Sequence, residues 1–193
     1  MNTNIFKLNS KSSGHAYLVS EALPQGYFKE YFNGKPLPSS WVPPAFEIKK
    51  VKAKLPDILA WKEYLPLLSH KAVNLFEEIA PGCAEYKECL RIEGNPYYVI
   101  NVLAAQDILD IENSEVSLTT DGNIRLVKRF VFRNHVSSPL FKLSILLDGP
   151  IFITRRLAQE ILAAGLLGFE FRDPGVNETS LLFHGANAGV CPN

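Results

Sequence analysis

The chain of 193 residues is 47% hydrophobic and 21% charged, so it can bury a core that offsets its ordering entropy, and global disorder is excluded. Its length favours one compact domain, or two small lobes that share a core, over an array of independent modules. The 20 Lys and Arg residues balance 20 Asp and Glu residues, which excludes a global polycation that binds nucleic acid by counterion release but leaves a local basic face open.

The first 50 residues are rich in aromatic side chains, glycine and proline. A short strand is expected around Ala16–Val19. Because proline fixes φ and lacks an N–H, a continuous helix or a central strand is disfavoured in the sequence that follows. We therefore predict that residues 1–50 form an irregular segment packed on the body through its aromatic rings. Long loops of this kind often carry function, and the simpler interpretation is a wrap that covers one face.

Helical spacing begins at Leu55. A short helix is predicted from Pro56, which suits a first helical turn, to Tyr64. A second helix follows Ser69, a good N-cap, and ends at Pro81-Gly82. Its apolar face is formed by Ala72, Phe76 and Ile79.

Two hairpins are predicted in the middle of the chain. The first pairs residues 84–92 with residues 97–102 around the turn residues 93–96, and the second pairs residues 115–118 with residues 124–132 around Asp121-Gly122. Residues 102–111 fit either a short helix or a loop. Residues 141–146 fit either a helix or a strand.

A strand–helix–strand unit is predicted near the C-terminus. Ile151–Ile153 forms the first strand, Thr154 caps a helix that ends at Gly165, and Phe169–Phe171 forms the returning strand. The helix after Ser69 shows the same spacing of a hydroxyl cap and apolar residues. A duplicated strand–helix–strand unit is therefore possible, although the pattern is common to capped amphipathic helices.

Together these elements predict an α+β fold with a mixed or mainly antiparallel sheet and a few packed amphipathic helices. After the segment of residues 1–50, residues 51–183 are expected to form a single α+β domain. Residues 184–193 are expected to form a loose C-terminal tail.

Motifs for nucleotide or metal chemistry are missing from the sequence. Neither the P-loop pattern nor G-x-G-x-x-G occurs, and the four histidines have no partner at three or four residues' distance. Cys83 and Cys89 are six residues apart, which is wider than the usual spacing of zinc ligands. We therefore expect no metal and no cofactor.

The cysteines and the hydropathy indicate a compartment. Cys83, Cys89 and Cys191 form an odd, sparse set, which is typical of reduced thiols in the cytosol and not of a disulfide framework. The N-terminal residues include no apolar signal region, and no apolar run is long enough to span a membrane. We expect a soluble cytoplasmic protein without membrane contact.

Two charged stretches are candidate binding surfaces. Four carboxylates lie between Asp107 and Glu115, either as paired acids of a hydrolase or as a solvated face. On a regular strand, Arg125, Arg129 and Arg133 would share one face, which could hold phosphates or a partner's carboxylates. The two stretches could also neutralise each other.

Two segments carry motifs of a known family. In residues 57–111, the helix after Ser69 ends at Pro81-Gly82, and the strand Tyr97–Asn101 leads to a segment with Asp107. In residues 139–174, an apolar strand and a helix precede Ala163–Phe171, which reads Ala-Ala-Gly-Leu-Leu-Gly-Phe-Glu-Phe. These segments resemble the myxobacterial-type immunity protein family of bacterial polymorphic toxin systems.

The resemblance implies a cytoplasmic protein that is encoded beside a toxin, binds that toxin and blocks it. The shared positions have the character of core and turn residues, so we do not expect an enzyme. An inhibitor needs shape, aromatic anchors and complementary charge. The candidate partner-binding residues are Tyr31, Trp41, Asp107, Asp110, Glu112 and Arg129.

Two other functions stay open at this point. One is a hydrolase that reverses toxin damage with Cys89 or with the carboxylates of residues 107–115. The other is a nucleic-acid-binding domain that uses Arg125, Arg129 and Arg133, which the balanced charge disfavours. The sequence leaves the oligomeric state undetermined.

Overall fold

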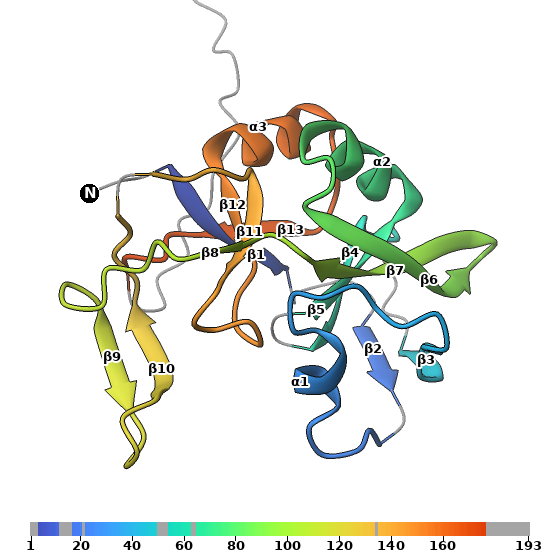
Figure 1. The fold of residues 1–193 in the computed structure, drawn as a ribbon. Coiled ribbons are helices and arrows are strands. Elements are labelled where there is room, and N and C mark those ends of the chain that lie inside the picture. Colours follow the sequence, from blue (N-terminus) through green and yellow to red (C-terminus); the bar gives the residue numbers. More distant parts are fainter. Residues whose placement is uncertain are drawn as a thin grey trace, which may run out of the picture.

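A computed structural model describes residues 4–11, 17–20, 22–49, 54–62, 65–133 and 135–176. It has an α+β fold, as predicted, with antiparallel and mixed sheets and short helices (Figure 1). The elements in chain order are β1 (Ile5–Ser10), β2 (Tyr17–Ser20), α1 (Tyr27–Tyr31), β3 (Phe46–Lys49), β4 (Ile58–Lys62), β5 (Leu65–Ser69), α2 (His70–Ile79), β6 (Ala84–Ile92), β7 (Asn95–Val102), β8 (Ala105–Gln106), β9 (Glu115–Leu118), β10 (Ile124–Arg129), β11 (Leu140–Leu143), β12 (Phe152–Thr154), α3 (Arg155–Ala163) and β13 (Phe169–Arg172). The expected tail of residues 184–193 lies outside the described residues.

One sheet has the strand order β4-β5-β7-β6, with antiparallel neighbours. The predicted β6–β7 hairpin is confirmed. Its turn uses Glu93 (φ 51°) and Gly94 (φ 83°), and two successive positive φ angles match the twist of the paired strands. Ser69 ends β5 and caps α2, because its Oγ accepts a hydrogen bond from the Ala72 N–H at 3.2 Å, as the sequence predicts.

The second sheet has the order β13-β1-β12-β11-β8. β1 pairs antiparallel with both β12 and β13, while β11 and β8 pair in parallel. The predicted strand–helix–strand unit is confirmed as β12, α3 and β13. Thr154 occupies the N-cap position of α3, but its side chain makes no cap hydrogen bond within the part of the chain that the structure describes.

The two sheets repeat one arrangement of strands. In each, a strand that precedes a helix and the strand that follows it flank an antiparallel strand, which is β7 between β5 and β6, and β1 between β12 and β13. An additional antiparallel strand flanks the first of them, β4 beside β5 and β11 beside β12. Helices α2 and α3 lie side by side over the sheets (Figure 1). The predicted strand–helix–strand repeat is therefore present in the strand order of the two sheets.

The helix predicted from Pro56 to Tyr64 is wrong where the structure describes it, because residues 58–62 form β4. Ile58 packs into the core beneath the helices, whereas Leu59 and Trp61 pack into a second, aromatic core. A strand that is buried on both faces shows a continuous apolar run and loses the alternation by which strands are identified. Residues 102–111, predicted as a short helix or a loop, form mostly loop around the two-residue strand β8. Residues 141–146, predicted as a helix or a strand, begin within the strand β11 and continue into a turn.

Asp57 joins the two sheets. Its Oδ1 accepts a hydrogen bond from the Ser69 hydroxyl at 2.7 Å, and its Oδ2 accepts one from the backbone N–H of Leu167 at 2.8 Å. The next residue, Gly168, has φ 88° and packs so closely that an added Cβ would lie 2.6 Å from the Pro56 Cβ. Within the Ala163–Phe171 motif, Leu167 and Gly168 therefore hold the connection between α3 and β13 against the segment before β4, which joins the two sheets.

Candidate interaction surface

Strands β9 and β10 form a separate two-stranded ribbon that projects from the body at the lower left of Figure 1. The predicted Asp121-Gly122 turn is confirmed, since the Gly122 N–H donates to the Thr119 carbonyl at 3.0 Å. At the base of the ribbon, the Asp110 N–H donates to the Val131 carbonyl at 2.8 Å, and the Phe130 N–H donates to the Pro174 carbonyl at 2.9 Å. The ribbon is thus fixed at one end and exposed at the other.

The predicted row of arginines on one strand face is wrong. Pairing with β9 shifts register between Ile124 and Leu126 and again between Val127 and Arg129. Each irregularity breaks the alternation of faces that a regular strand imposes. Val127 is buried although it lies between exposed arginines, and β10 ends at Arg129, so Arg133 lies beyond the strand.

The acidic and basic stretches meet at the base of the ribbon and partly satisfy each other. Asp110 accepts hydrogen bonds from the Asn113 side chain at 2.8 Å and the Asn113 N–H at 3.2 Å. These bonds, with a smaller contribution from Arg133, lower the pKa of the Asp110 carboxyl. Arg129 donates to the Asn113 carbonyl at 2.8 Å, so Asp110 and Arg129 are held by the same turn.

Two of the candidate carboxylates have no bonding partner within the described residues. Asp107 and Glu112 are exposed, and within the described residues neither side chain makes a hydrogen bond or an ion pair. Glu115, by contrast, forms an ion pair with Lys128 at 3.5 Å. Asp107 and Glu112 are therefore available to a partner's hydrogen-bond donors and cations, whereas Glu115 already has a cation.

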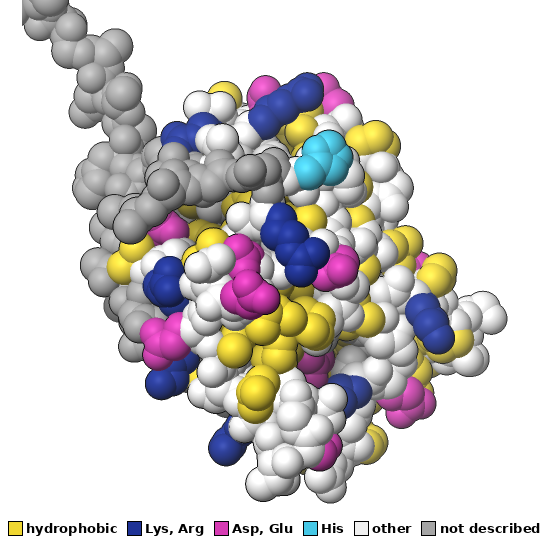
Figure 2. All heavy atoms as spheres, turned by 60° about the vertical axis from the view of Figure 1, so that its left-hand side comes forward, with side chains coloured by type: hydrophobic (Ala, Val, Ile, Leu, Met, Phe, Trp, Pro, Cys, Tyr) yellow, Lys and Arg dark blue, Asp and Glu magenta, His cyan; other side chains and the backbone are white. Residues whose placement is uncertain are grey.

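Exposed apolar side chains on the ribbon are a feature that the sequence analysis missed. Leu118 is 56% exposed, Leu126 is 48% exposed, and Ile111 at the base is 40% exposed. Figure 2 shows hydrophobic side chains gathered beside Lys, Arg, Asp and Glu on the face turned forward from the left of Figure 1. The sequence offered a sign of this surface, because Leu118 and Leu126 flank the predicted Asp121-Gly122 turn. Side chains near the end of a two-stranded hairpin that projects from the body lie too far from the core to be buried by it.

Tyr31 and Trp41 lie elsewhere, in the aromatic core beside α1. The Trp41 Nε1–H donates to the Tyr27 hydroxyl at 2.9 Å, and the Tyr31 ring centroid lies 4.8 Å from that of Tyr27. Both side chains are half-buried against the cluster that contains Phe32 and Trp61. The six candidate residues therefore do not converge on one site: Tyr31 and Trp41 belong to the aromatic core, and the other four, Asp107, Asp110, Glu112 and Arg129, lie in the ribbon or the segment that leads into it.

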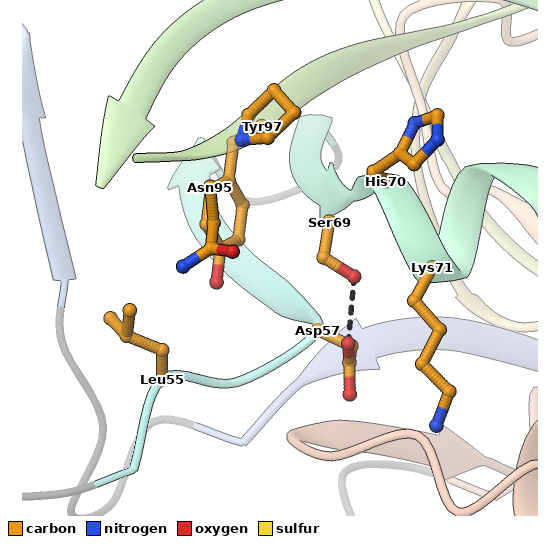
Figure 3. Close-up of a pocket in the computed structure, with 8 residues that line it drawn as sticks. Leu55, Asp57, Ser69, His70, Lys71, Asn95 and Tyr97 are labelled. Atoms are coloured by element: carbon orange, nitrogen blue, oxygen red, sulfur yellow. Dashed lines mark hydrogen bonds between the residues drawn. The ribbon is translucent and has the colours of Figure 1, made fainter. Parts of the chain in front are cut away.

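A pocket of about 220 Å³ lies at the start of α2, where Ser69, His70 and Asp57 are close in space (Figure 3). These residue types could suggest a nucleophile, a base and an acid. However, the Ser69 hydroxyl donates to Asp57 at 2.7 Å, and the His70 ring points away from it, with Nδ1 3.4 Å from the Tyr98 hydroxyl. A catalytic triad needs the base on the nucleophile and the acid on the base. The arrangement instead matches a helix cap.

Cys89 does not have the environment of a nucleophile. Burial raises the pKa of its thiol to about 12, so the thiolate is scarce at neutral pH. Its Sγ lies 3.2 Å from the Lys87 carbonyl, and Cys83 is buried. Within the described part of the chain there is no group of three or more potential metal ligands.

Among the described residues, no helix is long and apolar enough to cross a membrane.

Comparison with known proteins gives a family for the whole described chain. A search of curated proteins found no match. The model of the immunity protein family Imm11 matches residues 1–176, which include both of the segments that resemble an immunity protein. The matched range spans both sheets, the aromatic segment and the ribbon. The chain therefore belongs to the Imm11 immunity protein family.

Proposed function

We propose that this protein binds the toxin encoded beside its own gene and neutralises it in the cytoplasm by protein–protein contact, without catalysis. Membership of an immunity protein family is the observation that carries this proposal. The environments of Ser69 and Cys89 support a binding role, because the hydroxyl is engaged in a helix cap and the thiol is held protonated.

The ribbon is the proposed toxin-binding surface. Leu118 and Leu126 offer apolar area that folding leaves exposed, and charged side chains lie at the base of the strands. Stable interfaces share this pattern of an apolar centre that loses water and a polar rim that sets orientation. The fixed base reduces the entropy lost when the ribbon is ordered against a partner.

The free carboxylates give the surface a charge preference. Asp107 and Glu112 have no cation of their own among the described residues, so they favour a partner with basic side chains near the contact. Exposed charges at the rim of an interface act mainly on the association rate. Asp107→Asn together with Glu112→Gln should lower the association rate constant and weaken its dependence on salt.

A substitution on the ribbon tests the proposal. Leu118→Asp combined with Leu126→Asp places two charges on the apolar area and should weaken toxin binding roughly 100-fold or more. Both side chains are exposed, so the free energy of unfolding should change by about 0.5 kcal/mol or less. The measurements are survival of cells that express the toxin and titration calorimetry with an inactive toxin variant.

Leu162→Asp is the matched control, since Leu162 is 41% exposed on α3 and lies away from the ribbon. It should protect cells as the unchanged protein does. A double variant that protects fully would remove the ribbon as the binding surface. An unchanged protein that neither protects cells nor elutes with the toxin would refute the proposed function itself.

A further inference from the structure

The loop between α1 and β3 has an unusual composition for an exposed segment. From Pro36 to Phe46 it contains no charged residue, although 21% of the chain is charged. Pro36 and Pro38 are exposed, and Val42 is 75% exposed, more than any other large hydrophobic side chain that the structure describes. Depletion of charge with retention of apolar groups is typical of the centre of a protein interface.

A buried amide and a half-buried carboxylate hold one end of this loop against the β6–β7 hairpin. Asn101 is 1% exposed, and its Nδ2 donates to the Lys35 carbonyl at 2.7 Å and to Glu85 Oε1 at 2.7 Å. The same Glu85 oxygen accepts a hydrogen bond from the Leu37 N–H. Glu85 and Asn101 are opposite each other in the strand ladder, so the sheet presents both groups to the loop backbone.

Aromatic contacts hold the other end. The Trp41 N–H donates to the Pro38 carbonyl at 2.9 Å, which closes a turn over Ser39 and Ser40. The Trp41 indole donates to Tyr27 at 2.9 Å and packs edge-on to Phe32 with a centroid distance of 6.1 Å. The buried Leu37 and the half-buried Trp41 therefore anchor a loop in which Pro36, Pro38 and Val42 are exposed.

This arrangement is costly unless the fixed loop has a use. The Asn101 amide and the Glu85 carboxylate lose water to bond the backbone of an exposed segment. The Val42 side chain stays in water, so its burial does not offset this cost. A loop held in its bound conformation loses little entropy on binding, which increases affinity without any additional contact. Proline adds to this effect because its φ angle is already fixed.

We propose that residues 36–42 are a preorganised binding loop that inserts into an uncharged, apolar groove on the toxin. The proposal rests on the proposed function and adds a second contact, separate from the ribbon. Such a groove suits a loop that presents the exposed apolar side chains of Pro36, Pro38 and Val42 on a backbone that is held in place before binding. The toxin is the expected occupant because the loop offers no charge with which to recognise a polar ligand.

Affinity measurements with an inactive variant of the adjacent gene's toxin test the loop, using the full chain throughout. Val42→Asp should weaken binding roughly 10-fold or more, because it buries a charge in an apolar groove. Ser39→Gly with Ser40→Gly should weaken binding several-fold, since it frees the backbone without removing an apolar contact. Leu162→Asp should leave affinity unchanged.

The outcomes separate the loop from the proposed function. If Val42→Asp binds the toxin like the unchanged protein while the Leu118→Asp, Leu126→Asp double variant does not, the loop is not a contact and the proposed function stands. If the unchanged protein does not bind, both fail. Sedimentation of the protein alone is the further check: a dimer that Val42→Asp converts to a monomer would assign the loop to a second copy of this chain and overturn the proposal.

Discussion

At the scale of single residues, Lys142 is an ionisable group with no place in the proposed interfaces. It is 3% exposed in β11, and its Nζ donates to the Leu147 carbonyl at 2.7 Å. Burial lowers its pKa from 10.5 to about 8, and the nearby Asp148 carboxylate offsets this only in part. A charged ammonium in this position opposes folding at neutral pH.

The pKa shift predicts a pH dependence of stability. Between about pH 8 and 10.5 the unfolded chain holds more protons at Lys142 than the folded chain, so this group's contribution to the free energy of unfolding rises with pH across that window. Lys142→Met should therefore be more stable than the unchanged protein at pH 7, by on the order of 2 kcal/mol before the lost hydrogen bond is counted.

Urea unfolding of both proteins from pH 7 to pH 10 measures this difference. The gap should narrow as the pH rises, because the unchanged protein loses the penalty by deprotonation. Lys87→Met, at an exposed position, is the control and should show no such trend. Parallel pH profiles for Lys142→Met and the unchanged protein would contradict the prediction.

At the scale of elements, local signals predicted more than long-range ones. The cap of α2, the β6–β7 turn and the β9–β10 turn depend on neighbours in sequence, and all are observed. β4 was missed because its two faces pack into different cores, which erases alternation. The faces of β10 were missed because strand register depends on its partner strand, which the sequence of one strand does not reveal.

The two helix caps give a matched prediction, since one hydroxyl is bonded and the other is not. Ser69→Ala removes an acceptor for the Ala72 N–H and a donor to Asp57, and should lower the free energy of unfolding by about 1–2 kcal/mol. Thr154→Ala removes no cap bond in the described chain and should cost about 0.5 kcal/mol or less. Chemical denaturation of both variants checks this, and equal losses would show that the α3 cap is formed in solution.

At the scale of the whole molecule, the repeated arrangement of the sheets was only partly visible in the sequence. The shared cap-and-helix pattern indicated two similar units, but the strand at the centre of each comes from a different place in the chain. β7 follows β6 directly, whereas β1 reaches its position between β12 and β13 from the other end of the described chain. Pairing across such a distance has no local signature.

The candidate site residues were predicted unevenly for the same reason. Asp110 and Arg129 both bond Asn113, and both belong to charged stretches that are visible in the sequence. These two residues could therefore be proposed from the charge pattern alone. Asn101 and Glu85 were missed, because their use by the loop after α1 depends on a contact between distant segments.

Contact between the halves can be tested at Gly168. Gly168→Ala adds a Cβ that would lie 2.6 Å from the Pro56 Cβ, on a backbone with φ 88°. Gly165→Ala, with φ 64° and nothing within 4 Å, isolates the conformational cost alone. We expect Gly165→Ala to lower the free energy of unfolding by about 1 kcal/mol and Gly168→Ala by about 3 kcal/mol.

Thermal and urea unfolding of the two variants measure the difference between them. The excess loss at Gly168 reports how tightly the α3–β13 connection rests on the segment before β4. Equal losses would mean that the contact relaxes without cost. If the halves are coupled as described, Gly168→Ala should also broaden the transition.

The central position of β1 also constrains the order of events during synthesis. Residues 58–102 contain every strand of the first sheet, so that sheet can form while later residues are still being translated. The second sheet is complete only after Phe169–Arg172 has left the ribosome, because this strand pairs with the free edge of β1. Until then one edge of β1 has no partner strand, so the hydrogen bonds on that edge depend on residues more than 150 positions later in the sequence.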